Sequence, residues 1–256
     1  MSVISSARLI GTPAESRDYM PLISWLILIG CIAVGLLVLF RLGLVQIMLE
    51  TDRSHISVLI LTVFALTTLH CLYQTFIISR ELAAARRIRE TILEGTSGFR
   101  VIAGRTETAE GRLLEPSITA RHIGNLVAKS RAQGGRRVDQ TLLLRALADQ
   151  LRGREKLGWF VAEALLRLAL LGTAVGFILM LVPIAGLNSF DVETLRTALA
   201  GMSGGMAVAL NVTVAGIACA LLLKMEYYIL DTAIAQLFNT ITEVTEVHVV
   251  SVLEKN

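Results

Sequence analysis

Four long runs of the chain contain no charged side chain, and they set the pattern of the whole sequence. The runs extend over Met20–Phe40, Ile56–Ser79, Leu168–Phe190 and Thr197–Leu223. Each has the roughly 20 residues, about 30 Å of helix, that cross the hydrocarbon core of a bilayer. The pattern predicts an all-α integral membrane protein with four transmembrane helices, at about 20–41, 56–79, 160–186 and 197–224. The alternative is a soluble protein with four buried core helices, but four such runs in one small chain argue against it.

The segment between the second and third runs is polar and predicts a helical insertion over 80–156. Strong helix formers fill 79–95, and Gly95 is expected to end that helix. Pro116 and Ser117 are expected to begin the next helix, and leucines alternate with charges at helical spacing over 138–157. Residues 96–112 are rich in glycine and threonine and predict a loop.

Charged residues beside the last two runs predict that both helices extend beyond the bilayer. Glu163 and Arg167 are four apart, the spacing of a same-face ion pair on a helix. The two residues also fit a position in the headgroup region, so both interpretations stay open. Apolar residues continue at helical spacing after the fourth run. The expected divisions are a first membrane hairpin over 1–79, the insertion over 80–156, a second membrane hairpin over 157–227 and a C-terminal helix over 228–256.

The charges are few and unevenly placed. The chain is 54% hydrophobic and 18% charged, with a formal net charge of +3. The insertion from Arg80 to Lys156 holds 16 Lys and Arg against 9 Asp and Glu. A basic excess in one loop marks the cytoplasmic side of a membrane protein, which places both termini there as well. Nucleic-acid binding is disfavoured, because the basic residues are mixed with acidic ones and almost no aromatic residues accompany them.

Neither a signal peptide nor a disulfide framework fits the sequence. The first run is too long for the apolar part of a signal peptide, and no cleavage site follows it, so an uncleaved span is expected. Each of the three cysteines lies inside an apolar run and is expected to be a packing residue. No phosphate loop, metal cluster or nucleophile–base pair is found, so an enzyme is not expected.

Small residues line the second membrane hairpin at spacings of three and four. They are expected to let its helices approach closely, and they are Ala169, Gly172, Gly176, Gly201, Gly205, Ala209 and Gly216. Thr173 and Thr213 lie on the same faces and at similar depth, which suggests an arranged pair of hydroxyls. The alternative is that each threonine bonds its own backbone. Asn211 is roughly 200° around the helix from Thr213, so a contact with a neighbouring helix or subunit is expected.

Ionisable groups are scarce in the membrane. Within the first two expected spans, His70 is the only side chain that titrates readily, and it suits either a proton relay or a packed, interfacial position. No acidic or basic residue lies near the centre of any expected span. Proteins that move cations across a membrane usually hold them with a carboxylate. If this chain conducts ions, the carboxylate must come from another protein.

Two segments of the second hairpin resemble the MotA/TolQ/ExbB family of proton-channel subunits. They are "LRLALLGTAVGFILML" at 166–181 and "GMSGGMAVALNVTVAGIACALLL" at 201–223, and the approach "REKLGWFVAEAL" resembles the family too. The four-span plan with a large insertion is similar to MotA, whereas the local motif is closer to TolQ and ExbB. TolQ and ExbB carry a glutamate five residues before the second threonine, where this chain has Val208. A role of that glutamate therefore does not transfer.

The resemblance implies a stator-type subunit of an ion-driven motor in the bacterial inner membrane. It implies a homopentamer around two copies of a single-span partner like ExbD, TolR or MotB, whose membrane aspartate carries the ion. Thr173 and Thr213 match the family's threonines and would line the path of protons, or as a second choice sodium ions. No cofactor is implied beyond the transported ion. A non-conducting oligomeric scaffold and, further behind, a solute transporter remain the alternatives.

Overall fold

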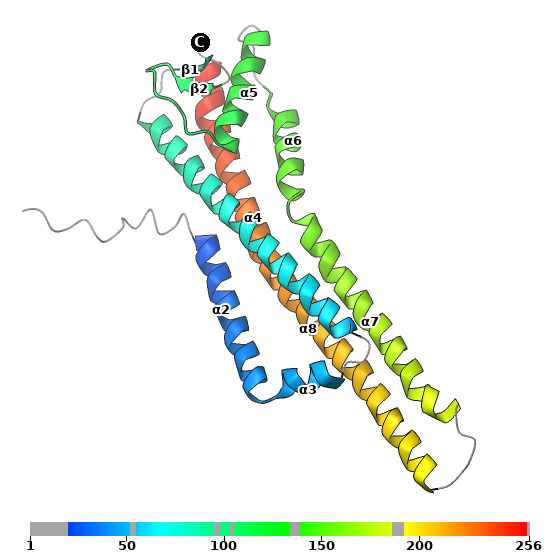
Figure 1. The fold of residues 1–256 in the computed structure, drawn as a ribbon. Coiled ribbons are helices and arrows are strands. Elements are labelled where there is room, and N and C mark those ends of the chain that lie inside the picture. The colour runs from blue at the N-terminus through cyan, green and yellow to red at the C-terminus, as the bar shows by residue number, and fades with distance from the viewer. Residues whose placement is uncertain are drawn as a thin grey trace, which may run out of the picture. The chain divides into compact units, whose positions relative to one another are not determined.

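The computed structural model describes residues 20–51, 55–94, 98–102, 105–133, 139–185 and 192–254. Helices dominate this part of the chain (Figure 1). In chain order the elements are α2 (Met20–Arg41), α3 (Leu44–Thr51), α4 (Ile56–Leu93), β1 (Phe99–Ile102), β2 (Arg105–Thr108), α5 (Ile118–Ala132), α6 (Thr141–Arg152), α7 (Lys156–Ala185), α8 (Val192–Val244), the π-helix η1 (Thr245–Val250) and α9 (Ser251–Leu253).

Four helices of the described chain, α2, α4, α7 and α8, are long and apolar enough to cross a membrane. This confirms the expected all-α membrane class with four spans. α7 includes Glu163 and Arg167, which form the predicted ion pair at 3.3 Å. α8 continues to Val244, so the expected extension of the fourth helix is also confirmed. The first 19 residues, including the expected N-terminal segment, lie outside the described residues.

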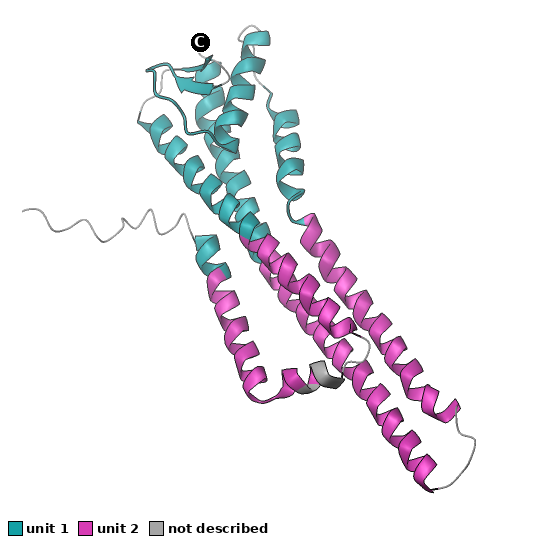
Figure 2. Cartoon of the chain, viewed as in Figure 1, with its two compact units in different colours: residues 1–25, 73–155, 229–256 teal, residues 26–72, 156–228 magenta. Residues whose placement is uncertain are grey.

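The chain divides into two compact units (Figure 2). One unit comprises residues 1–25, 73–155 and 229–256, and it holds most of the insertion together with the end of α8. The other comprises residues 26–72 and 156–228, and it holds the membrane hairpins. The long helices α4 and α8 contribute to both units because each passes from one to the other.

The core of the insertion unit is formed by apolar side chains from α4, β1, α5 and the C-terminal helices. Its most buried members include Ile88, Phe99, Ile123, Leu126 and Val249. Ser117 caps α5 by accepting a hydrogen bond from the Ala120 amide at 3.1 Å, which confirms the helix start expected at this position. The Ile118 amide of the same first turn donates to Glu81 of α4 at 2.8 Å. Two orphan amides of the α5 N-terminus are thus satisfied, one of them by a neighbouring helix.

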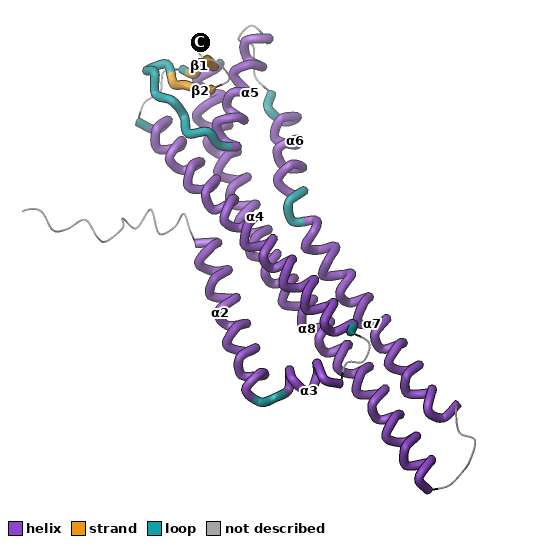
Figure 3. The backbone as a smooth tube through the Cα atoms, in the orientation of Figure 1, coloured by secondary structure: helices purple, strands orange, loops and turns teal. Residues whose placement is uncertain are grey.

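The prediction of a loop over 96–112 was wrong in part. β1 and β2 form an antiparallel hairpin that pairs Phe99 with Thr108 (Figure 3). Phe99, Thr106 and Thr108 are buried, so each strand turns side chains toward α5 on one face only. This alternation was hidden in the sequence because threonines, instead of larger apolar residues, fill the inner face of β2. Gly95, the expected end of the preceding helix, lies outside the described residues.

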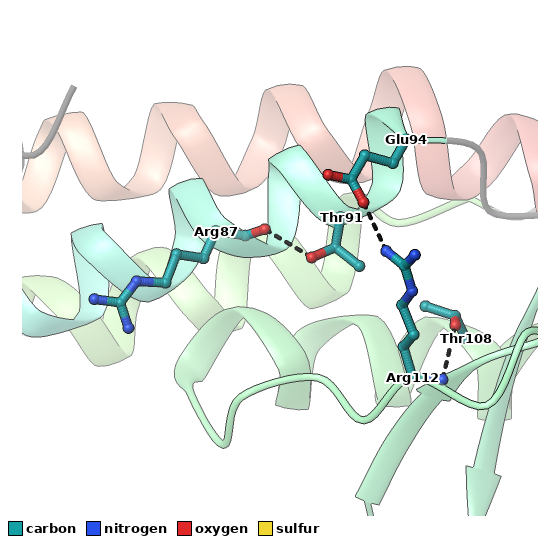
Figure 4. Close-up of polar contacts among 5 residues, drawn as sticks. All are labelled: Arg87, Thr91, Glu94, Thr108 and Arg112. Atoms are coloured by element: carbon teal, nitrogen blue, oxygen red, sulfur yellow. Dashed lines mark hydrogen bonds and ion pairs between the residues drawn. The ribbon is translucent and has the colours of Figure 1, made fainter. Parts of the chain in front are cut away.

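Polar contacts connect the β1–β2 hairpin and the residues that follow it to the end of α4 (Figure 4). Arg112 forms an ion pair with Glu94 at 2.6 Å, and its amide donates to the Thr108 hydroxyl at 3.2 Å. Thr91 donates to the Arg87 carbonyl of its own helix at 3.0 Å. The ion pair is exposed on both sides and contributes little to stability. The buried apolar core therefore supplies most of the stability of this unit.

Candidate functional site

The two helices of the second membrane hairpin, α7 and α8, pack along a seam of small residues. A Cβ atom added at Gly205 would lie 2.4 Å from the Met180 backbone nitrogen, a distance that side chains do not tolerate. The same close approach recurs along the seam, where the facing pairs are Gly172 with Val212, Gly176 with Ala209, Gly201 with Pro183 and Gly216 with Ala169. The glycines thus bring the two backbones close together, the packing that suits helices in a lipid environment.

The facing pairs define the register of α7 against α8, and the register places the two threonines. Thr173 follows Gly172 and Thr213 follows Val212, so both threonines lie at the level of this contact. Each residue advances about 100° around its helix. Gly172 and Val212 face each other across the seam. Because α7 and α8 are antiparallel, the residue that follows each of them in the sequence turns toward the same side of the seam. Thr173 and Thr213 therefore emerge at one depth and on one side of the hairpin.

Both threonine hydroxyls donate to their own helices. Thr173 Oγ1 donates to the Leu170 carbonyl at 2.6 Å, and Thr213 Oγ1 donates to the Ala209 carbonyl at 2.8 Å. These bonds to the threonines' own backbones are the alternative to an arranged pair of hydroxyls that the sequence left open. Each hydroxyl oxygen still has acceptor lone pairs. Both residues are half-buried in the single chain, so these acceptors can receive a proton donor from water or from another protein.

The opposite side of the seam is covered by α4 of the first hairpin. Ile56 at the start of α4 approaches Gly172, and Thr68 bonds Glu226 of α8 at 3.0 Å. Glu226 and Thr213 are 13 residues apart, which separates them by roughly 140° around α8. The threonine pair therefore lies on the side of the hairpin that α4 leaves uncovered.

Asn211 and Val208 lie away from the threonines. Asn211 is half-buried, and its side-chain amide makes no hydrogen bond to the described part of the chain. Among the described residues the expected contact with a neighbouring helix does not involve a hydrogen bond, and a contact with another subunit stays a prediction. Val208 is 1% exposed, and by the helical period it shares the side of α8 that carries Glu226. A buried valine at this position leaves the α7–α8 hairpin without an acidic group at the depth of the threonines.

The sequence did not single out a polar cluster between α4 and α8. Its members are Thr68, His70, Glu226 and Tyr227. The His70 Nδ1 atom lies 2.8 Å from the Tyr227 hydroxyl, so His70 has a partner. Tyr227 is 1% exposed and Glu226 is fully buried. Only the pairing of helices more than 150 residues apart brings the four side chains together, and no local sequence signal marks that pairing.

These geometric findings coincide with a family assignment. A model of the MotA/TolQ/ExbB proton channel family matches residues 112–243, just over half of the chain. The chain belongs to this family. No curated protein and no solved structure matches it.

The MotA/TolQ/ExbB match confirms the resemblance found in the sequence and extends it. It includes α5, α6, all of α7 and α8 as far as Glu243, and therefore both threonines and the glycine seam. The helices α2, α3 and α4 precede the match. Members of the family are channel-type membrane proteins, not enzymes, and they generally work with a single-span partner in oligomeric complexes. The chain is accordingly a multi-pass membrane protein of channel type.

Proposed function

We propose that this protein is the ion-conducting stator subunit of a membrane motor in the bacterial inner membrane, with both termini in the cytoplasm. The observation that carries the proposal is the threonine pair: Thr173 and Thr213 lie level on one side of the second hairpin, each within a run that contains no charged side chain (168–190 and 197–223). That hairpin lies within the family match. A homopentamer would turn the threonine side of each hairpin toward a central pore, and the α4 side toward lipid.

The ion carrier in this proposal is a membrane aspartate on a single-span partner, present in two copies. The hairpin itself supplies hydroxyl oxygens that accept hydrogen bonds but no group that titrates near the bilayer centre. A protonated aspartate could donate to Thr173 or Thr213 of one subunit and then of the next. Successive transfers would turn the pentamer relative to the partner dimer and convert proton flow, or as a second choice sodium flow, into mechanical work.

The proposal is tested by replacing both threonines with valine, which keeps the shape and removes the hydroxyl. The T173V/T213V protein is co-expressed with its single-span partner, and proton flux into vesicles is measured together with complex formation. Loss of one such hydrogen bond is expected to lower flux by roughly two- to tenfold, since a hydrogen bond between neutral groups contributes about 0.5–1.5 kcal/mol. Complex formation is expected to stay intact.

A matched control distinguishes a specific effect on the ion path from a general effect of replacing a membrane threonine. Thr62 of α4 also donates to its own helix, to the Val58 carbonyl at 2.8 Å, but it lies outside the hairpin. T62V should conduct like the wild type, and the T173S/T213S protein should retain most of the flux. Full flux in T173V/T213V would contradict the conducting role and favour the scaffold, because the threonine bonds to their own backbones would then be sufficient.

A further inference from the structure

Glu226 is an acidic residue in a place where a charge is costly. Its side chain is fully buried between α8 and α4. The Thr68 hydroxyl donates to Glu226 Oε1 at 3.0 Å, while Oε2 has no hydrogen-bond partner within the described chain. One neutral donor is much less than the two or three hydrogen bonds that a buried carboxylate needs.

Neighbouring contacts hold Glu226 in this position. Tyr227, the next residue, bonds His70 of α4 at 2.8 Å. The ring of Tyr227 lies against Gly158 of α7, where an added Cβ would come within 2.2 Å of the ring. Glu226 and Tyr227 of α8 therefore both bond to α4, and the ring of Tyr227 also packs against α7. Glu226 cannot turn outward to water without breaking this packing.

Within the part of the chain that the structure describes, no positive charge pairs with Glu226. The titratable neighbours on α4 are His70, which bonds Tyr227, and Cys71, which is fully buried. On α8, Lys224 lies two residues earlier and so about 160° away around the helix. On α7 the ionisable residues nearest Gly158 are Lys156 and Glu163, and Glu163 pairs with Arg167. Within the described chain, Glu226 forms no ion pair.

We propose that Glu226 is a proton-binding site whose bound proton holds α8 against α4. A buried carboxylate without a cation is strongly unfavourable, whereas the neutral acid keeps its bond from Thr68 and fits the apolar surroundings. Loss of the proton at alkaline pH creates an unpaired buried charge, and separation of α4 from α8 relieves it. Glu226 faces α4, on the side of α8 away from Thr213. The proton-binding role of Glu226 is therefore independent of the proposed ion path.

Cys71 reports directly on this contact because it lies fully buried on α4, next to His70. In full-length protein with Cys31 and Cys219 changed to serine, the rate of Cys71 modification by N-ethylmaleimide is measured in lipid nanodiscs between about pH 6 and about pH 9. The E226Q variant keeps the shape and the acceptor for Thr68 but cannot lose a proton. Dividing the wild-type rate by the E226Q rate removes the ordinary pH dependence of the thiol.

The ratio of the two rates is expected to rise with pH by about fivefold or more, because only the wild type develops the buried charge. A ratio that does not change with pH, whatever its value, overturns the proposal. E163Q, which alters an exposed glutamate on α7, should follow the wild type. T68V removes the hydroxyl that stabilises the carboxylate, so the midpoint of the rise should move to higher pH, and an unchanged midpoint would exclude Thr68 from the site.

Discussion

Threonines in the membrane hairpins carry the same hydroxyl and use it in two ways. Thr173 and Thr213 donate to carbonyls of their own helices, which satisfies the donor and leaves acceptors on an uncovered side. Thr68 donates across helices to the Glu226 carboxyl. The first use suits a path along which a proton donor moves, and the second fixes two helices to each other. Residue type alone therefore does not decide how a threonine in these helices uses its hydroxyl.

His122 of α5 is the residue at which stability should depend on pH. Its side chain is 4% exposed, and burial lowers the pKa of His122 below the ordinary 6.5, with a smaller opposing effect of the Gln140 side chain. The unfolded chain therefore binds a proton near pH 6.5 while the folded unit does not. The stability of the insertion should be complete above that pH and decrease as the pH falls below it.

Hydrogen exchange of residues 118–132, followed by mass spectrometry and corrected for intrinsic rates, measures this effect. Exchange of α5 should be faster at about pH 5.5 than at about pH 7.5, and H122Q should remove most of the difference because glutamine does not titrate. Equal exchange of the wild-type helix at both pH values would show that protonation of His122 does not oppose folding.

Residue positions were predictable where they depend on one helix and its nearest partner. The positions of Thr173 and Thr213 follow from helical spacing and an antiparallel hairpin, so the sequence placed both at one depth. Glu226 was not singled out, because its burial depends on α4, which is distant in sequence.

At the scale of elements, the seam between α7 and α8 should be sensitive to single methyl groups. Gly205 faces the Met180 backbone, whereas a Cβ at Gly204, on the same helix, would have nothing within 4 Å. Alanine favours a helix over glycine by about 1 kcal/mol at either site. G204A should therefore be neutral or stabilising, while overpacking in G205A should lower the stability by about 1–3 kcal/mol.

Thermal unfolding of the two purified variants in the same detergent tests this difference, with helicity as the signal. Because the substitutions are identical and adjacent, the order of the two melting temperatures is the critical result. A melting temperature of G205A equal to or above that of G204A would mean that α7 and α8 do not approach as closely as the seam requires.

Long elements were easier to predict than short ones. The charge-free runs marked four membrane helices, and Ser117 marked the start of α5, because both signals are local. The hairpin of β1 and β2 was expected to be a loop. Its four-residue strands gain their order from packing on α5, where Thr106 donates to the Ala120 carbonyl at 3.0 Å. No property of residues 96–112 alone supplies that partner.

At the scale of the whole molecule, the threonine side of the hairpin is apolar and uncovered in a single chain. Phe177 follows Thr173 by one helical turn and is 56% exposed. Met206 lies seven residues before Thr213, on nearly the same side, and is 54% exposed. Either lipid or other protein chains must cover these side chains. The proposed pentamer assigns this side to the pore and to the single-span partner.

Cysteine cross-linking distinguishes lipid from protein on this side. In a background without Cys31, Cys71 and Cys219, M206C should form covalent dimers with a neighbouring copy when a short bismaleimide is added to membranes. Leu59 of α4 is the matched control: it is 49% exposed and lies nine residues, or about 180°, from Thr68, so it points away from α8. L59C should remain uncross-linked, because in the proposed assembly it faces lipid.

The yield of these products also tests the arrangement of subunits. If Met206 surrounds a central pore, cross-linking in M206C should be abundant and should disappear when the complex is dissolved in denaturing detergent before the reagent is added. Native mass spectrometry of the same preparation should give five copies of this chain with two of the partner. Cross-linking in L59C but not in M206C would place α4 inside the assembly and the threonines outside, which would reverse the proposed orientation and remove the threonines from any ion path.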